Sequence, residues 1–351
     1  MNNRIYLYLC WVVVTLKIFV FISYFYGFGI SFGGGSDANM YHAAAIGEIN
    51  VTVNIWPVIL HFLFDYGLYN REVVTFLLFF ISMFIIPLLF LLLIMDEKKT
   101  KDKVYYLSFF WIVLYPTIYF FSNDIFRDVV MVFLFLITSY ICKVGCLSYK
   151  FKFKILYFTI AFLLSYVLYL FRPYLGFSIA VAIVFYPLLF MFKRMSLVLL
   201  LYFIFCTVAA TIGLFEPLME YRSGFELAGG GSTLGLQLTG NNPILFIPKF
   251  ILSYLFQFFG LFLVSPAAIF VFVTESIVVI YAFVFLCKNK KYFNGFIAFL
   301  ICFAVVYNTV WIIANDNLGT AVRLRIYSYI AIVVAGVITY RNKEISKGMG
   351  N

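Results

Sequence analysis

The stretch from Val73 to Met95, VVTFLLFFISMFIIPLLFLLLIM, contains no charged side chain. A helix needs about 20 consecutive apolar residues to cross the hydrocarbon core of a bilayer. This stretch is therefore predicted to span a membrane. Nine further apolar stretches predict spans near 5–28, 104–121, 126–145, 155–172, 174–192, 195–214, 267–287, 293–314 and 324–340. The expected fold class is an all-α polytopic membrane protein with about ten transmembrane helices.

The composition excludes a water-soluble fold. Of the 351 residues, 65% are hydrophobic and 11% are charged, whereas a soluble domain carries about 25% charged residues. The net charge of +10 comes from short basic runs between apolar stretches. Because these runs do not form a basic polar face, we expect no nucleic-acid partner. We expect a single transmembrane domain over residues 1–351, in contact with the lipid bilayer.

The distribution of basic residues predicts the orientation of the chain. Lys and Arg gather in the cytoplasmic loops of membrane proteins. Alternate loops hold most of the 25 basic residues, and both termini fall on that side. The opposite, outer face has two long segments, about 29–72 and about 215–266. The first contains an amphipathic stretch around Ile55–Phe64, and the second contains an aromatic stretch, Pro248–Pro266, that predicts an interfacial helix or re-entrant hairpin.

The basic residues of the outer face are nearly all arginine. They are Arg71, Arg127, Arg172, Arg222, Lys249, Arg323 and Arg325. A guanidinium group is a rigid, always-charged fork that binds phosphate through two hydrogen bonds. Several arginines placed against the topological preference therefore predict an anion-binding site. The alternative is that they pair with acidic residues of the same face, as Arg71 could with Glu72.

Charged residues open the predicted span 126–145. Asp124 is a candidate N-cap, and Arg127 and Asp128 follow about one turn later on a similar helix face. Charged residues at the start of a membrane helix are costly to bury and are functional by default. Capping alone accounts for Asp124, but it does not account for Arg127.

Two other outer segments present arginine next to a span. Arg172 precedes Pro173, which restricts the backbone of this turn, and Tyr174 follows; an arginine and a tyrosine that anchor the chain at the membrane surface are the alternative. Arg323 and Arg325 lie at the entry to the last span. Helical spacing places these two side chains about 200° apart, so that one could face a cavity while the other faces an interface.

Candidate proton acceptors lie close to glycine runs of the outer face. Asp37 and His42 follow the run Gly33–Gly35, and either could take a proton from a sugar hydroxyl. Arg222 and Glu226 belong to the loop predicted at Tyr221–Glu226, which precedes the run Gly229–Gly231. The backbone N–H groups of this loop could form an anion nest. A plain mobile loop is the alternative for the second segment, and ordinary interfacial placement is the alternative for His42.

Other polar features predict little chemistry. Lys17 and Glu275 lie within predicted spans, where we expect them to pair with each other or to extend toward the membrane surface. The six cysteines have neither the spacing of a metal site nor an outer-loop position that favours disulfides. The sequence has no phosphate-binding loop, no zinc-protease motif and no dinucleotide fingerprint.

Four short motifs together resemble a known family. They are Gly-Ser-Asp-Ala-x-x-Tyr-His at 35–42, Arg-Asp at 127–128, Arg-Pro-Tyr-Leu at 172–175 and Gly-Thr-Ala-x-Arg-x-Arg at 319–325. These motifs, and the layout of the whole chain, resemble bacterial O-antigen and capsule repeat-unit polymerases of the Wzy type and the related EpsG-like proteins. The resemblance implies a GT-C-like glycosyltransferase in the bacterial inner membrane, with its active site on the periplasmic face.

The resemblance also implies a substrate and roles for individual residues. The substrate is an undecaprenyl-diphosphate-linked oligosaccharide, which is transferred to another lipid-linked repeat unit without a metal or other cofactor. A chain-length regulator is a candidate protein partner. Asp37 is the first candidate for the catalytic base, followed by His42 and Glu226. The residues expected to bind diphosphate or glycan are Arg127, Asp128, Arg172, Tyr174, Arg222, Arg323 and Arg325.

Three alternative functions compete with polymerisation. The first is another transferase of the GT-C kind, either an O-antigen ligase or an enzyme that uses a prenyl-monophosphate sugar; the number of arginines favours a diphosphate. The second is a flippase or transporter of the same lipid, although transporters bind substrate near the bilayer midplane and the polar groups here lie at the outer boundary. The third is an acyltransferase, for which the short basic cytoplasmic loops offer few polar groups.

Overall fold

The computed structural model describes residues 3–28, 35–50, 54–95, 102–190, 195–227, 233–236, 238 and 245–348, without the side chains at 3, 36, 189–190, 195–199, 221 and 223–227. The chain forms two compact units, residues 1–177 and residues 178–351. Regular structure in the described ranges is helical, apart from one isolated β-bridge between Thr233 and Asn317. The predicted all-α class is confirmed.

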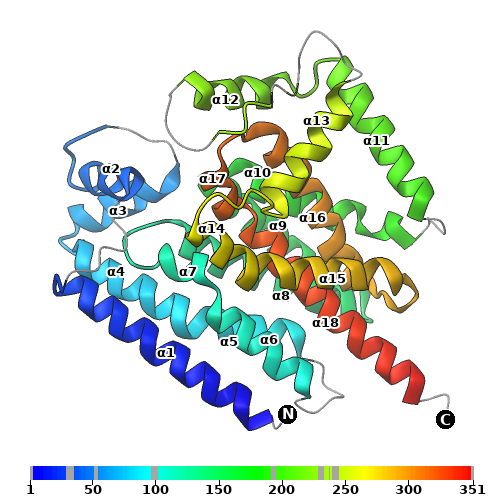
Figure 1. Ribbon diagram of the computed structural model, residues 1–351, viewed down its shortest axis with the longest axis horizontal. Coiled ribbons are helices and arrows are strands. Elements are labelled where there is room, and N and C mark those ends of the chain that lie inside the picture. Colours follow the sequence, from blue (N-terminus) through cyan, green and yellow to red (C-terminus); the bar gives the residue numbers. More distant parts are fainter. Residues whose placement is uncertain are drawn as a thin grey trace. The chain divides into compact units, whose positions relative to one another are not determined.

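The first unit contains nine α-helices and the start of a tenth in its described residues (Figure 1). They are α1 (Asn3–Phe25), α2 (Ser36–Ala45), α3 (Ile55–Asp65), α4 (Arg71–Phe80), the π-helix η1 (Ile81–Ile85), α5 (Ile86–Ile94), α6 (Lys103–Leu114), α7 (Pro116–Phe120), α8 (Asp128–Leu147), α9 (Phe151–Phe171) and the start of α10 (Pro173–Phe185). Helix α8 packs along α9 and also contacts α5, while α1 packs on α6.

The described residues of the second unit run from α10 to Gly348. They form the 3-10 helix η2 (Tyr186–Phe190), α11 (Met195–Thr211), α12 (Glu216–Leu227), α13 (Phe246–Ser253), the π-helix η4 (Tyr254–Phe258), α14 (Pro266–Val271), the π-helix η5 (Phe272–Ser276), α15 (Ile277–Lys288), the 3-10 helix η6 (Lys290–Tyr292), α16 (Gly295–Ala314), α17 (Leu318–Leu324) and α18 (Ile326–Gly348). Helix α18 packs against α15 and α16.

Six helices in the described ranges are long and apolar enough to cross a membrane. They are Arg4–Phe25, Arg71–Ile94, Asp128–Leu147, Phe151–Phe171, Pro266–Lys288 and Gly295–Ala314. A seventh span results if Leu318–Leu324 and Ile326–Lys347, which meet at a bend of 43°, cross together. The chain is thus a helical protein with the hallmarks of a multi-pass membrane protein.

The three other predicted spans form shorter or interrupted helices. The predicted span 104–121 divides into α6 and α7 at Pro116, because proline has no N–H to continue the helix. The predicted spans 174–192 and 195–214 contain the shorter apolar helices Pro173–Leu188 and Leu200–Thr211. Helix α3 and the helix Phe246–Phe258 occupy the amphipathic and aromatic stretches of the two outer segments.

Lys17 supports the break between α6 and α7. Its ammonium group donates to the carbonyls of Val113 at 2.7 Å and Tyr115 at 3.4 Å, which lie on the N-terminal side of Pro116 at the break. The Tyr119 hydroxyl in turn donates to the Lys17 carbonyl at 2.9 Å. Lys17 thus contacts carbonyls within the first unit, and Glu275 lies beside Arg325 in the second unit. The contacts of Lys17 hold the chain just before the charged segment Ser122–Asp128.

Candidate functional site

The start of α8 and the end of α9 bring three predicted site residues together in the first unit. Asp128 is the first residue of α8 and is only 1% exposed, and Arg172 follows the last residue of α9 and is 3% exposed. Their charged groups approach to 3.6 Å. The positive end of the α8 dipole stabilises a carboxylate at this position. The predicted turn therefore directs Arg172 onto a buried acid.

Arg127 lies next to this buried pair but is more accessible. It is half-buried, and its guanidinium Nη1 donates to the Phe171 carbonyl at 2.6 Å. Within the described part of the chain, Arg127 forms no ion pair. The contact that the structure gives the Arg127 charge is the dipole of the Phe171 carbonyl. Tyr174, the second residue of α10, lies with its ring 5.8 Å from the Arg172 guanidinium carbon.

Asp124 has a different role from the one predicted. The N-cap residue of α8 is Arg127, and no side chain caps this helix, so the expectation that Asp124 is the N-cap is wrong. Asp124 instead binds Arg71 through two oxygens, at 3.0 Å from Nε and 2.7 Å from Nη2. The partner of Arg71 is thus Asp124 rather than the neighbouring Glu72.

The first turn of α2 lies against the segment that leads to Arg127. A β-carbon placed on Gly35 would lie 3.4 Å from the Phe126 ring, and the Asn39 side chain accepts a 3.0 Å hydrogen bond from Arg71. Asp37 lies between these two contacts in the sequence and is half-buried. The predicted base Asp37 is therefore in α2, and the start of this helix lies beside Phe126, the residue before Arg127.

His42 faces another group of the same unit. Its Nδ1 atom lies 2.9 Å from the hydroxyl of Tyr69, and burial raises the pKa of Tyr69 to about 12. His42 lies five positions after Asp37, which places the two side chains about 140° apart around the axis of α2. A neutral Tyr69 hydroxyl can fix the orientation of the His42 ring, whereas Asp37 points in a different direction from this pair.

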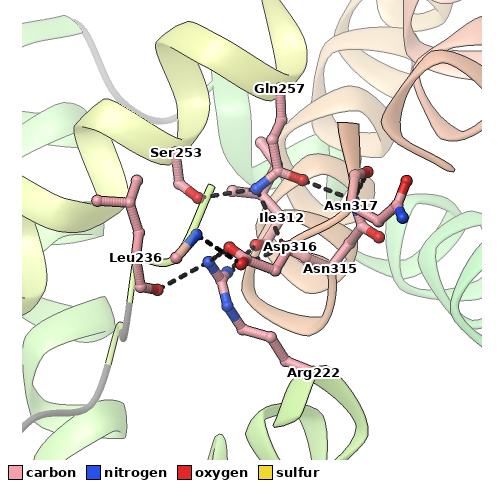
Figure 2. Close-up of polar contacts among 9 residues, drawn as sticks. Arg222, Leu236, Ser253, Gln257, Ile312, Asn315, Asp316 and Asn317 are labelled. Atoms are coloured by element: carbon pink, nitrogen blue, oxygen red, sulfur yellow. Dashed lines mark hydrogen bonds and ion pairs between the residues drawn. The ribbon is translucent and has the colours of Figure 1, made fainter. Parts of the chain in front are cut away.

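Arg222 is the centre of a polar network in the second unit (Figure 2). It is 3% exposed and donates to the carbonyls of Ile312 at 3.2 Å, Asn315 at 2.9 Å and Leu236 at 2.8 Å. It also pairs with the fully buried Asp316. The first two carbonyls lie in the last turn of α16 and just beyond it, where a helix lacks internal donors. Arg222 therefore caps α16.

The rest of the network fixes the corner between α16 and α17. Gln257 donates to the Asn315 carbonyl at 3.0 Å and accepts from the Asn315 side chain at 2.7 Å, and Ser253 accepts from Gln257 at 2.8 Å. The second oxygen of Asp316 accepts from the Gly235 N–H at 2.9 Å. These contacts join η4, α13, α16 and the segment 233–236 around one buried charge pair.

The predicted loop around Arg222 is in fact a helix. Residues Glu216–Leu227 form α12, so the expectation of a loop with an anion nest at Tyr221–Glu226 is wrong. A helix leaves no row of free N–H groups at this position. The side chain of Glu226, one of the three predicted bases, lies outside the described residues, as does the glycine run 229–231.

The two arginines that enter the last span have different environments. Arg325 is 3% exposed, lies 3.7 Å from the fully buried Glu275, and stacks on the Tyr329 ring at 5.1 Å. Arg323 is half-buried on α17, a helix whose first turn is capped by Asn317. Arg325 is thus enclosed, whereas Arg323 is more accessible.

The candidate arginines therefore form two groups. Arg172, Arg222 and Arg325 are buried beside the acids Asp128, Asp316 and Glu275, which matches the ion-pair alternative. Arg127 and Arg323 are half-buried and border these pairs in the sequence. The sequence analysis named Asp128 as a site residue and Glu275 as an isolated charge within a span, and it named neither Asp316 nor Gln257. Buried polar residues in an apolar chain were the available signal for both.

The fold and these clusters define a helical protein that buries charge pairs at the ends of apolar helices. Within the described ranges, no group of three His, Cys, Asp or Glu side chains is placed to hold a metal ion. In comparisons with known proteins, no family model matches the sequence, and no curated protein or solved structure matches the chain.

Proposed function

We propose that the protein is a polysaccharide polymerase that transfers a glycan from undecaprenyl diphosphate to a lipid-linked repeat unit. In this proposal the chain crosses the bacterial inner membrane ten times with both termini in the cytoplasm, in a GT-C-like arrangement. The catalytic face is periplasmic. A chain-length regulator is its candidate partner.

The observation that carries the proposal is the position of Arg127. Its guanidinium is half-buried at the positive end of α8 and has no ion pair among the described residues. The backbone dipole and the guanidinium both favour an anion at this position. The adjacent pair Arg172–Asp128 holds its own charges in balance, so the net positive charge of the cluster resides on Arg127. A phosphate group has the charge and the oxygen geometry that such a position binds.

The proposed reaction is a direct displacement at the anomeric carbon. The acceptor hydroxyl oxygen forms a bond to that carbon, while the bond from the carbon to the diphosphate oxygen breaks and its electron pair leaves with the diphosphate. Asp37 accepts the proton of the hydroxyl, and attack from the opposite face inverts the anomeric centre. Arg127 stabilises the charge that develops on the leaving group. The donor arrives activated, so no nucleotide is required.

Arg323 is the corresponding candidate in the second unit. It is half-buried on α17, whereas Arg325, two residues later, is enclosed with Glu275. We propose that Arg323 contacts the lipid-linked substrate and that Arg222 and Arg325 maintain the local structure. Tyr174 is proposed to contact the glycan, because a tyrosine ring next to a guanidinium offers a flat apolar face for a sugar.

Other transferases and a flippase differ from the polymerase in their products. An O-antigen ligase moves a finished glycan to a different lipid, and a transferase of single sugars uses a prenyl-monophosphate donor. A flippase changes the leaflet of the lipid and leaves its glycan unchanged. The lengths of the glycans formed from a single lipid-diphosphate-linked repeat unit therefore distinguish these functions.

The test uses purified protein in lipid vesicles with a lipid-diphosphate-linked repeat unit and no nucleotide. We expect a ladder of longer glycans from the unaltered protein. Arg127→Ala should slow its formation by about 10²–10³-fold, the range for losing one well-placed donor to a developing anion. Lys347→Gln is the matched control, since it removes an exposed positive charge paired only with Glu344. Glycans of unchanged length from the unaltered protein would overturn the proposal.

A further inference from the structure

A narrow apolar crevice in the second unit takes no part in the proposed reaction. It has a volume of about 70 Å³ and lies beside the end of the span Pro266–Lys288. Ile301, Ala304, Val305 and Asn308 line it along α16, and α15 and α18 supply further apolar walls. Lys290 also lines it. The crevice thus has an apolar interior and a basic residue at the end where the span finishes.

The dimensions of the crevice favour a hydrocarbon chain. At roughly 30 Å³ for a water-sized group, it has room for two or three methylene groups but not for a sugar ring. Phe283 is 40% exposed and Val305 is 43% exposed, so the walls are open to the side. A short part of an acyl chain, just below its headgroup, can therefore occupy the crevice while the rest of the chain follows the exposed surface of α15 and α16.

Three lysines surround the position where the span ends. Lys288 is the last residue of α15, and Lys290 and Lys291 begin η6. Lysines at the end of a span extend their ammonium groups to the level of the lipid phosphates. Basic pockets between transmembrane helices bind anionic lipid headgroups. The basic cluster is therefore placed to hold a phosphate above the apolar crevice.

The loop that carries these lysines is held in one conformation. The buried Asn289 side chain donates to the Phe285 carbonyl at 2.8 Å, and Asn342 of α18 donates to the Tyr292 carbonyl at 2.9 Å. These contacts fix both ends of η6 to the neighbouring helices. A loop that only oriented the chain in the membrane would need the three lysines but not the hydrogen bonds of Asn289 and Asn342. The fixed geometry of the loop therefore favours recognition of a ligand.

We propose that the crevice is a binding site for an anionic phospholipid. One acyl chain occupies the crevice toward Asn308, and the phosphate group binds the cluster of Lys288, Lys290 and Lys291. A zwitterionic phospholipid satisfies the apolar crevice but adds a positive headgroup charge next to three ammonium groups. The site should therefore prefer phosphatidylglycerol over phosphatidylcholine with the same chains.

Trp311 provides a local probe of the inner end of the crevice. It is fully buried, and its indole N–H donates to the Asn308 side chain at 2.9 Å. Bromine atoms on an acyl chain quench tryptophan fluorescence at short range. The protein would be placed in phosphatidylcholine vesicles and titrated with brominated phosphatidylglycerol or brominated phosphatidylcholine. The Trp311→Phe variant identifies the part of the signal that comes from this position, because the chain has four tryptophans.

We expect brominated phosphatidylglycerol to quench Trp311 at several-fold lower concentration than brominated phosphatidylcholine. Substitution of Gln for Lys288, Lys290 and Lys291 should make the two lipids equal. The variant Val305→Phe, at an exposed position of the wall, should reduce quenching by both lipids. Lys152→Gln, which removes an exposed lysine of α9 in the first unit, should leave the preference unchanged. Equal quenching by the two lipids in the unaltered protein, or a preference that survives the triple substitution, would overturn the proposal.

Discussion

Arg172 and Asp128 form an ion pair at 3.6 Å that is almost completely enclosed by protein. Asp128 begins α8, and Arg172 stands between α9 and α10. The pair therefore joins the start of α8 to the junction of α9 and α10, more than 40 residues later in the sequence. A buried charge is costly by itself, and each member of this pair compensates for the other.

Removing one member of this pair should destabilise the first unit. Asp128→Asn leaves Arg172 buried without its counter-ion, which costs about 3–5 kcal/mol. Thermal unfolding of the purified protein in detergent should show a lower midpoint for this variant. The double variant Asp128→Asn with Arg172→Met should recover part of the loss, because it removes both buried charges. Strictly additive losses would show that the two groups are not coupled.

Arg222→Lys should lower stability without changing affinity for the lipid-linked substrate. A lysine ammonium cannot reproduce the fork that contacts three carbonyls and Asp316. Leaving buried carbonyls unsatisfied costs about 1–3 kcal/mol. The measurements are the thermal unfolding midpoint and the KM for the lipid-linked repeat unit. A large rise in KM at unchanged stability would instead assign Arg222 to substrate binding.

The apolar pattern of the sequence was enough to predict the helical class and most long helices. Helix α8 and the helix Gly295–Ala314 lie close to their predicted ranges, because a long uncharged run has no other stable form in lipid. The pattern did not predict that Pro116 divides a span, because a hydropathy scale takes no account of the N–H that proline lacks. It also did not predict α12, whose mixed composition resembles a loop.

The sequence predicted which residues are unusual but not how they are paired. Arg127 and Asp128 are adjacent in the chain, yet Asp128 contacts Arg172 and Arg127 contacts the Phe171 carbonyl. Arg71 binds Asp124, 53 residues away, rather than the neighbouring Glu72. Such long-range pairing depends on which helix ends meet, and a single sequence does not specify this. The burial of each arginine side chain, which the structure gives and the sequence does not, distinguishes the enclosed Arg172, Arg222 and Arg325 from the half-buried Arg127 and Arg323.

Asp37→Asn should slow polymerisation much more than it changes substrate binding. An amide cannot accept the proton of the acceptor hydroxyl, and a positioned base contributes about 10²–10⁴-fold to rate. The measurement is the initial rate of glycan elongation at saturating lipid-linked repeat unit. His42→Gln is the matched comparison, because His42 contacts Tyr69 on another face of α2. If His42→Gln has the larger effect, the base is His42 and not Asp37.

The proposed orientation predicts which exposed residues can be labelled from outside the cell. Tyr66, after α3, is 67% exposed, and Tyr149, between α8 and α9, is fully exposed. Each would be changed to Cys in a chain whose six native cysteines are replaced. A membrane-impermeant maleimide added to intact spheroplasts should label Tyr66→Cys but not Tyr149→Cys, whereas both should react after lysis. The reverse pattern would place Arg127 and Asp37 in the cytosol, where undecaprenyl-diphosphate-linked repeat units are not polymerised, and the proposed function would have to be abandoned.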